Sequence, residues 1–310
     1  MIYTVTLNPA LDKTVEIPSF SVDRVNRVAK MRTDPGGKGI NVSKVIRSLG
    51  GTSIACGILA GHTGESILAS LQDLGLESYF VWEKGETRTN LKIIDPVCHT
   101  NTDINEPGIT VSEATLGGLL EALCARICAG DIVVLSGSLP KGAPKDTYGT
   151  WVHCLKEQSA EVFLDADGDL LRDGLLASPF LIKPNNYELS KLMGRDLSSI
   201  EDLKAAALEL IPQFGIGQVV VSMGADGALY VSQEQCLYAK GLKVPVGSTV
   251  GAGDSVVAAL ACAAEKGLPW EEAARLSTAV GAANVMCSGS QAAEYAVIER
   301  LLPKVEISRI

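Results

Sequence analysis

A short glycine-rich turn that ends in an acid is the stretch of this sequence best suited to catalysis. It reads Thr249-Val-Gly-Ala-Gly-Asp254, and a helical apolar pattern follows at once. Gly251 and Gly253 would let backbone N–H groups at a helix N-terminus approach an anion closely. Asp254 cannot attract a phosphate, so its place beside such a turn suggests a base that removes a proton. Together the two features predict phosphoryl transfer to a hydroxyl group. An ordinary loop with Asp254 as a helix cap is the alternative.

A second glycine turn carries a lysine and also opens a helix. The run is Asp34-Pro-Gly-Gly-Lys-Gly-Ile-Asn41. Lys38 stands among backbone donors at the helix start, which would allow an acidic chain to bind an anionic ligand. The spacing excludes a Walker A loop, and the first strand runs into Asn8-Pro9 rather than into the glycine turn of a dinucleotide-binding fold. A glycine-rich loop with a solvated lysine is the alternative.

The segments around these turns alternate between strand patterns and helix patterns. This alternation favours a parallel sheet with helices on both faces. Polar or glycine-rich clusters recur where strands or loops give way to helices, and ligands of open α/β sheets bind at the edge where parallel strands end. We therefore expect five clusters to share that edge, at residues 36–41, 136–138, 183–188, 222–227 and 251–254.

Two further stretches, about 12–34 and 87–106, alternate polar with apolar residues and are too polar to lie between two layers of helices. We expect them to form a small sheet that projects from the main body. The exposed face of this sheet should be covered by a ligand or by another subunit. Arg88, Asn90 and Lys92 share one face of it at period two, which fits either ligand binding or plain solvent exposure.

The composition is that of a folded protein with no preference for nucleic acid. The 310 residues carry a net charge of −9, with 46% hydrophobic and 20% charged residues, whereas a nucleic-acid-binding protein needs a basic face. We expect no membrane span and no targeting signal, because the chain starts with a strand pattern. The eight scattered cysteines form no metal-binding pair and indicate free thiols in a reducing cytoplasm.

Together these segments resemble the ribokinase-like sugar kinases, also called the phosphofructokinase-B family. The two glycine turns are similar to that family's two signature regions, and the likeness covers essentially the whole chain. Three further segments carry it: Tyr3-Thr-Val-Thr-Leu-Asn-Pro-Ala-Leu-Asp12, Asp103-Ile-Asn-Glu-Pro-Gly108 and Ser136-Gly-Ser-Leu-Pro140. The resemblance implies one domain over residues 1–310, built as a three-layer α/β/α sandwich with a central, mostly parallel sheet and a small β-sheet lid. It also implies ATP-dependent phosphorylation of a ketohexose phosphate, D-fructose 1-phosphate, to fructose 1,6-bisphosphate.

The resemblance assigns roles on the acceptor side of the site. Asp254 would be the general base, and the anion hole would be formed by Gly251, Ala252 and Gly253. The sugar hydroxyls would be bound by Asp12, Gly37, Gly39 and Asn41, with Asn90 beside them. The phosphate that the sugar already carries would be bound by Lys38, Arg27, Arg88 and Ser138.

The resemblance also assigns the donor side. ATP would be bound by Lys183, Asn185, Ser222, Met223, Gly224, Ala225, Asp226, Gly227 and Ser248. Mg²⁺ would be held by Asn185 and by Glu188, the latter through water. The loop near Ser248 and the segment near Asn284 would be the place for a monovalent cation such as K⁺. The exposed face of the lid implies a homodimer formed through the lid sheet.

Other acceptors within the family stay open. Asp103 stands where we expect a glutamate. The pair Ser248-Thr249 is similar to the residues of family members that phosphorylate fructose 6-phosphate. Lys38 argues against that acceptor, because those members tend to have glycine at this position. Kinases of tagatose 6-phosphate, of fructose 6-phosphate or of a nucleoside are therefore alternatives. A non-catalytic sensor of sugar phosphates on the same scaffold is another, and an assay of phosphosugars with ATP would separate it from the kinases.

Overall fold

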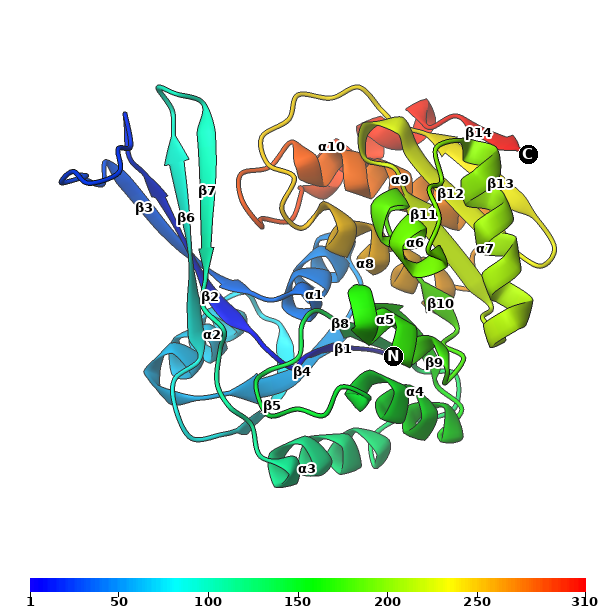
Figure 1. The fold of residues 1–310 in the computed structure, drawn as a ribbon, viewed down its shortest axis with the longest axis horizontal. Coiled ribbons are helices and arrows are strands. Elements are labelled where there is room, and N and C mark those ends of the chain that lie inside the picture. The colour runs from blue at the N-terminus through cyan, green and yellow to red at the C-terminus, as the bar shows by residue number, and fades with distance from the viewer.

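The larger of two sheets runs through the centre of the molecule (Figure 1). A computed structural model describes residues 1–310. Seven neighbouring strands, from β11 to β5, are parallel, and the three at the other edge are antiparallel. The order is β14 (Ile307–Arg309), β13 (Cys236–Lys240), β12 (Gly227–Ser232), β11 (Gln218–Ser222), β10 (Leu181–Ile182), β9 (Glu161–Asp165), β8 (Ile132–Ser136), β1 (Ile2–Thr6), β4 (Ser53–Leu59) and β5 (Glu77–Trp82). The predicted mostly parallel sheet is confirmed.

Helices cover both faces of this sheet, which explains why its central strands are continuous apolar runs. Every residue of β1 and of β8 is buried. One face carries α3 (Glu113–Cys124), α4 (Thr147–Glu157), α5 (Gly168–Leu175), α6 (Asn186–Met193) and α7 (Ile200–Phe214). The other carries α1 (Lys38–Ser48), α2 (Gly61–Asp73), α8 (Ala252–Glu265), α9 (Trp270–Val285) and α10 (Tyr295–Leu301).

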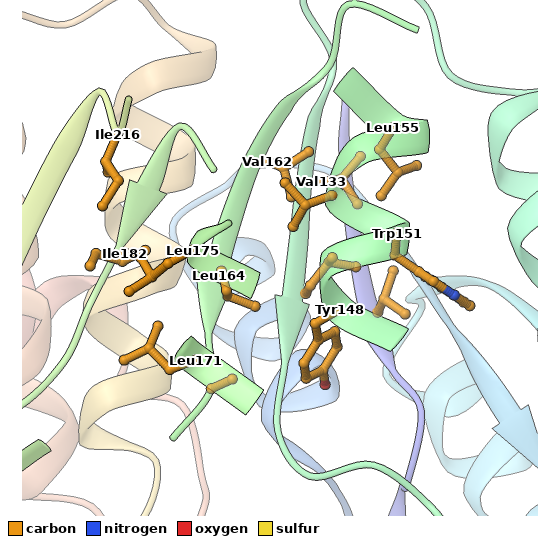
Figure 2. Close-up of a cluster of buried hydrophobic side chains, with 14 of the residues drawn as sticks. Val133, Tyr148, Trp151, Leu155, Val162, Leu164, Leu171, Leu175, Ile182 and Ile216 are labelled. Carbon is orange, nitrogen blue, oxygen red and sulfur yellow. The ribbon is translucent and has the colours of Figure 1, made fainter. Parts of the chain in front are cut away.

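The core on the first face shows how the strands and helices fit together. Figure 2 shows Tyr148, Trp151 and Leu155 of α4 in one buried cluster with Val133 and Val162 of the sheet. Each of these side chains is at most 3% exposed. Burial of such large apolar side chains stabilises the fold by about 1.5–3 kcal/mol each. The rigid body that results fixes the positions of the loops at the ends of the strands.

The smaller sheet forms a lid that projects from this body (Figure 1). Its strands are β3 (Lys30–Gly36), β2 (Ala10–Glu16), β6 (Arg88–Asp95) and β7 (Thr100–Asn105), in that order. β2 is antiparallel to β3 and parallel to β6. Within β2 and β3, Asp12 lies directly opposite Asp34, and Thr14 lies opposite Arg32. These strands overlap the two stretches in which the sequence predicts a lid.

The sequence prediction missed two regular elements. β14 is only three residues long and pairs with β13 at the sheet edge, so it is too short to show a strand period. α6 follows β10 directly and begins with a capping box, in which Asn185 and Glu188 each accept from the other's backbone N–H. The Asn-x-x-Glu spacing of a capping box is present in the sequence, although the role predicted for these two residues is ligand binding alone. No helix is both long enough and apolar enough to cross a membrane.

Candidate active site

The two glycine turns of the sequence meet in the structure. α1 begins after Gly37, whose φ is 113°, and α8 begins after Gly251, whose φ is 76°. Positive φ is strained for residues with a side chain, so glycine suits both positions. In neither helix does the N-cap residue have a side chain that could cap the first turn. Ile40 N–H of α1 donates to Thr6 Oγ1 at 3.0 Å, and Ala252 N–H of α8 donates to the Thr249 carbonyl at 3.3 Å, so the other donors of each first turn are the ones open to a ligand. Asn41 of α1 donates from Nδ2 to Asp254 Oδ2 of α8 over 2.8 Å and so joins the two turns.

Asp254 has the properties of a base that works near neutral pH. Its carboxylate is 6% exposed. Burial and the nearby charge of Asp165 raise the pKa of Asp254 to about 6, against the opposing effects of Lys38, Asn41 and Lys183. A carboxyl group with such a pKa is ionised at pH 7 yet binds a proton far more readily than an exposed aspartate. This is the balance that a general base needs.

Asp165 is a site residue that the sequence prediction missed. It ends β9 and is 4% exposed, between Lys38 Nζ at 3.4 Å and Lys183 Nζ at 3.5 Å. Burial would raise the pKa of Asp165, but attraction to the two lysines is stronger and lowers it. The same attraction raises the pKa of Lys38 although burial opposes the shift. An acid at the end of a buried parallel strand was the available signal, because that edge is where ligands bind.

The two lysines come from separate turns but face the same space. A Cβ atom placed on Gly253 would lie 3.1 Å from Lys183 Nζ, so this ammonium group is adjacent to the α8 turn. Lys183 is 6% exposed, whereas the side chain of Lys38 is 39% exposed. Two cations and two helix N-termini therefore surround Asp254, which is an arrangement suited to a group that carries several negative charges.

Asp12, Asn90 and Arg88 lie at the base of the lid. Asn90 donates from Nδ2 to Asp12 Oδ1 over 3.0 Å. Burial raises the pKa of Asp12, against that hydrogen bond and the charges of Lys44 and Arg88. Arg88 donates to the carbonyl oxygens of Asn8 and Glu106 at 2.9 and 3.1 Å. Its guanidinium group thus ties the lid to the body within this chain.

The remaining residues predicted for the acceptor differ in their placement. Gly37 and Gly39 pack on β1: a Cβ at Gly39 would lie 2.6 Å from Thr6 Oγ1, so the close approach of two backbones already requires glycine there. Ser138 is exposed, and its hydroxyl accepts from Asn8 Nδ2 at 3.3 Å. Arg27 is exposed and belongs to the connection between β2 and β3. This connection lies at the outer end of the lid (Figure 1). Within one chain the structure does not bring Arg27 to the other site residues.

The residues predicted for the donor gather at the ends of β10 and β11. Asn185 forms an isolated parallel bridge with Ser222, and a single 3₁₀ turn follows at Gly224–Asp226. Asn185 Oδ1 and Glu188 Oε2 each accept a backbone N–H at 2.8 Å in the capping box. No group of three or more His, Cys, Asp or Glu side chains is placed to hold a metal ion directly. Any metal contact from Glu188 would therefore use its other oxygen.

The segments around Ser248 and Asn284 are neighbours, as predicted for a cation site. The backbone N–H groups of Gly247 and Ser248 both donate to the Val285 carbonyl, at 2.7 and 3.1 Å. Asn284 is 2% exposed, and its Oδ1 has no hydrogen-bond partner. A buried oxygen without a partner costs about 1–3 kcal/mol unless a donor or a cation satisfies it.

Four more buried oxygens at the site accept no hydrogen bond. They are Asn41 Oδ1, Asn90 Oδ1, Ser136 Oγ and Asp165 Oδ2, the last of which has Lys38 as its ion-pair partner. Ser136 ends β8, at the same edge of the sheet as Asp165. Folded proteins rarely leave buried polar atoms unsatisfied, and a ligand with several hydroxyl groups would supply the missing donors. This chemistry fits a sugar.

Known proteins with a similar sequence or fold point in the same direction. A curated relative, 1-phosphofructokinase of Bacillus subtilis (strain 168), is 39% identical over 310 residues, which is 100% of each chain. Crystal structures of phosphofructokinase-2 from Escherichia coli, one in complex with substrates and products and one with potassium, have TM-scores of 0.94 and 0.93 at 32% identity, covering 98% of each chain. Ribokinase of Arabidopsis thaliana shares the fold, with a TM-score of 0.78 at 22% identity over 97% of this chain and 98% of its own.

The family model described as pfkB family carbohydrate kinase matches residues 5–296. That range contains the glycine turns of α1 and α8, the three strand ends that carry Ser136, Asp165 and Lys183, and the whole lid. The chain has the ribokinase-like α/β fold, is a phosphotransferase with an alcohol group as acceptor, and belongs to the pfkB family of carbohydrate kinases.

Proposed function

We propose that this protein transfers the terminal phosphoryl group of ATP to the free primary hydroxyl of D-fructose 1-phosphate and forms fructose 1,6-bisphosphate. The observation that carries the proposal is the Asn41–Asp254 contact between two open helix N-termini, with Lys38 and Lys183 beside it. The acceptor is chosen because the curated relative that matches the whole chain is a 1-phosphofructokinase.

Asp254 acts as the general base on the acceptor. It takes the proton of the sugar hydroxyl while that oxygen forms a bond to the terminal phosphorus and the bond to the bridging oxygen of ATP breaks, which releases ADP. Asn41 holds the carboxylate in place through its 2.8 Å hydrogen bond. Asp12, Asn90 and the partnerless Asn41 Oδ1 bind the other sugar hydroxyls. Positioning supplies most of the rate enhancement, because the phosphoryl group is already activated.

The transferred group is stabilised by the α8 turn and by Lys183. The turn formed by Gly251, Ala252 and Gly253 stabilises the charge that develops on this group through backbone N–H groups at the start of α8, and Lys183 lies next to Gly253. Lys38 binds the phosphate that the sugar already carries, with Ser138 and Arg88 near the lid base. Asp165 keeps both lysines in place through its two ion pairs.

The nucleotide and its ions belong at the ends of β10 and β11. The turn from Ser222 to Gly227 and the polar groups of Asn185 and Ser248 line the ATP site. Mg²⁺ would be held by Asn185 and, through water, by the Glu188 oxygen that does not cap α6. Mg²⁺ would neutralise charge on the triphosphate. The unsatisfied Asn284 Oδ1 beside the Ser248 loop fits a monovalent cation such as K⁺.

The protein forms a homodimer through its lid. Large apolar side chains are exposed on the lid strands and on the loop that joins β2 to β3. Each of the following is more than half exposed: Val22, Val25, Val28, Met31 and Ile104. A sheet with exposed apolar side chains and open edges is prone to pair with another copy.

A panel of acceptors tests the proposed reaction. With ATP and Mg²⁺, we expect kcat/KM for fructose 1-phosphate to exceed that for fructose 6-phosphate and tagatose 6-phosphate by about tenfold or more, since a misplaced phosphate loses its charged partner. A higher kcat/KM for either 6-phosphate would show that the acceptor is a different phosphosugar but would leave the proposed kinase activity intact. Binding of a phosphosugar without any phosphoryl transfer from ATP would instead support a non-catalytic sensor of sugar phosphates.

A further inference from the structure

The base of the lid is fastened to a loop that lies outside the residues discussed above. Arg32 of β3 binds Asp34 through Nε at 2.7 Å and donates from its other arm, NH2, to the Ser288 carbonyl at 3.0 Å. Lys44 of α1 donates to the Pro35 carbonyl at 3.0 Å and to Ser290 Oγ at 3.4 Å. We call Ser288–Ser290 the latch loop. It is reached by one cation from the lid and by one from the body.

The latch loop follows α9 and also touches the catalytic turn. A Cβ on Gly251 would lie 4.0 Å from Ser290 Cα and 3.5 Å from Asn284 Nδ2. Cys287, the residue before the latch loop, packs closely on Gly247: a Cβ atom at Gly247 would lie 2.6 Å from the Cys287 carbonyl oxygen. The segment that receives the lid's arginine is therefore packed against the turn that precedes Asp254.

The contact with Arg32 is closely fitted. Gly289 has a φ of 64°, and a Cβ placed on it would lie 2.4 Å from Arg32 NH2. Thr14, the cross-strand partner of Arg32, is the next nearest group, at 4.0 Å. The side chain of Arg32 is 32% exposed. Its bond to Asp34 is partly buried, whereas its bond to the Ser288 carbonyl is exposed to solvent; the fit against Gly289, rather than shielding from water, fixes this arm of the guanidinium group.

We propose that Arg32 is a positioning residue that, through the latch loop, sets the lid at the angle at which a bound phosphosugar faces Asp254. The lid supplies Asp12 and Asn90, and the body supplies Asn41 and Asp254, so the acceptor hydroxyl is placed correctly only if the two parts hold a fixed relation. The proposal rests on the phosphosugar kinase activity proposed above.

Kinetics of Arg32→Ala give the first test. We expect kcat/KM for the phosphosugar to fall about 10- to 100-fold, the range for loss of a hydrogen bond from a charged donor. The KM for ATP should change less than about twofold, because the nucleotide residues lie on the body. Lys30→Ala is the matched control: Lys30 lies on the same face of β3 but binds only Glu16. Arg32→Ala kinetics equal to those of Lys30→Ala would overturn the proposal.

Arg32 could act through its contact with the latch loop or through its charge, which neutralises that of Asp34. A double-mutant cycle separates these two effects. Gly289→Ala displaces the guanidinium group but keeps its charge. We expect Gly289→Ala to lower kcat/KM for the phosphosugar in the wild-type background and to change it less than about twofold in the Arg32→Ala background. Independent, multiplicative effects of the two substitutions would show that Arg32 does not act through the loop and would refute the proposal.

Amide hydrogen exchange tests the latch without relying on activity. In Arg32→Ala, exchange should rise about tenfold both in β3 and in residues 247–254, since both are braced by the latch loop. If the wild-type protein phosphorylates no phosphosugar, the proposed function fails, while this exchange pattern still reports on the latch. Faster exchange confined to β3 would mean that the lid and the catalytic turn are not coupled.

Discussion

The N-termini of α1 and α8 start from the same backbone arrangement and present opposite chemistry. Each follows a glycine with positive φ, and neither has a side-chain cap. The α1 turn then places a cation, Lys38, at its first position, whereas the α8 turn places a carboxylate, Asp254, at its third. The backbone therefore makes each turn suitable for binding an anion. The side chain decides its further role: Lys38 adds a charge that binds a phosphate, whereas Asp254 accepts a proton next to one.

The α6 turn nearby shows what a closed helix start looks like. There Asn185 and Glu188 satisfy each other's backbone N–H groups at 2.8 Å. The helices α2, α4 and α5 also lack a hydrogen bond from the side chain of the N-cap residue. What distinguishes α1 and α8 is the Asn41–Asp254 hydrogen bond, which brings their two turns together.

Asp254→Asn should have the largest effect. The amide oxygen can still accept from Asn41, so the turn should keep its structure, but the base is lost. We expect turnover to fall about 10²–10⁴-fold, with ATP affinity unchanged. Single-turnover kinetics and a direct ATP titration would measure the two quantities. Turnover close to that of the wild type would eliminate Asp254 as the base and with it the contrast between the turns.

Lys38→Ala should weaken binding of the acceptor rather than the chemistry. Loss of a charged contact to the sugar's phosphate is expected to raise the phosphosugar KM about 10- to 100-fold and the ATP KM by much less. Lys183→Ala is the matched variant, since it also removes one partner of Asp165, but it should affect the ATP side. Equal changes of both KM values in Lys38→Ala would remove Lys38 from the phosphate site.

The pH dependence of kcat/KM links the two turns. Asp254 must be ionised to act, so activity should fall about tenfold per unit as the pH drops below about 6. Lys38 lowers the pKa of Asp254; its removal should therefore shift this acidic limb to higher pH. Profiles of wild type and Lys38→Ala between pH 5 and 8 would measure the shift. A flat wild-type profile over that range would contradict the assignment of the base.

The buried charge of Asp254 should also reduce stability at neutral pH. Its pKa is raised from 3.8 to about 6, so the fold is favoured below pH 4 and loses this contribution as the pH rises through 6. Asp254→Asn removes the charge and should raise the melting temperature by a few degrees at pH 8, an order-of-magnitude expectation, and by less at pH 4.5. Calorimetry at both values would measure it; a lower Tm at pH 8 would contradict the expectation.

Alanine in place of the two cap glycines should give the smallest effects, in a defined order. At Gly251 the nearest atom to an added Cβ is 3.5 Å away, so only the positive φ is strained, at about 1–2 kcal/mol. At Gly37 the added Cβ would also lie 2.5 Å from Thr6 Cγ2. Gly37→Ala should therefore destabilise the protein more than Gly251→Ala, as measured by thermal unfolding. The reverse order would show that the contact with Thr6 does not add to the strain at Gly37.

Much of the fold and part of the site could be predicted from local sequence. The buried strand patterns of β1, β8 and β11 and the amphipathic helices between them predict a parallel sheet, and the glycine turns at 36–41 and 251–254 predict two anion sites. These signals are local because glycine, capping residues and apolar periodicity act within a few neighbouring residues. They also indicated Asp254 as a base.

Tertiary structure decided which charges meet. Asp165 is an unremarked acid in the sequence, yet β9 lies between β8 and β10 and its end brings that acid within 3.5 Å of lysines that are 127 and 18 residues away, at positions 38 and 183. The raised pKa of Asp254 and the contact of Arg32 with Ser288 likewise arise between distant segments. Such effects depend on distance and burial in three dimensions, which no local pattern of residues encodes.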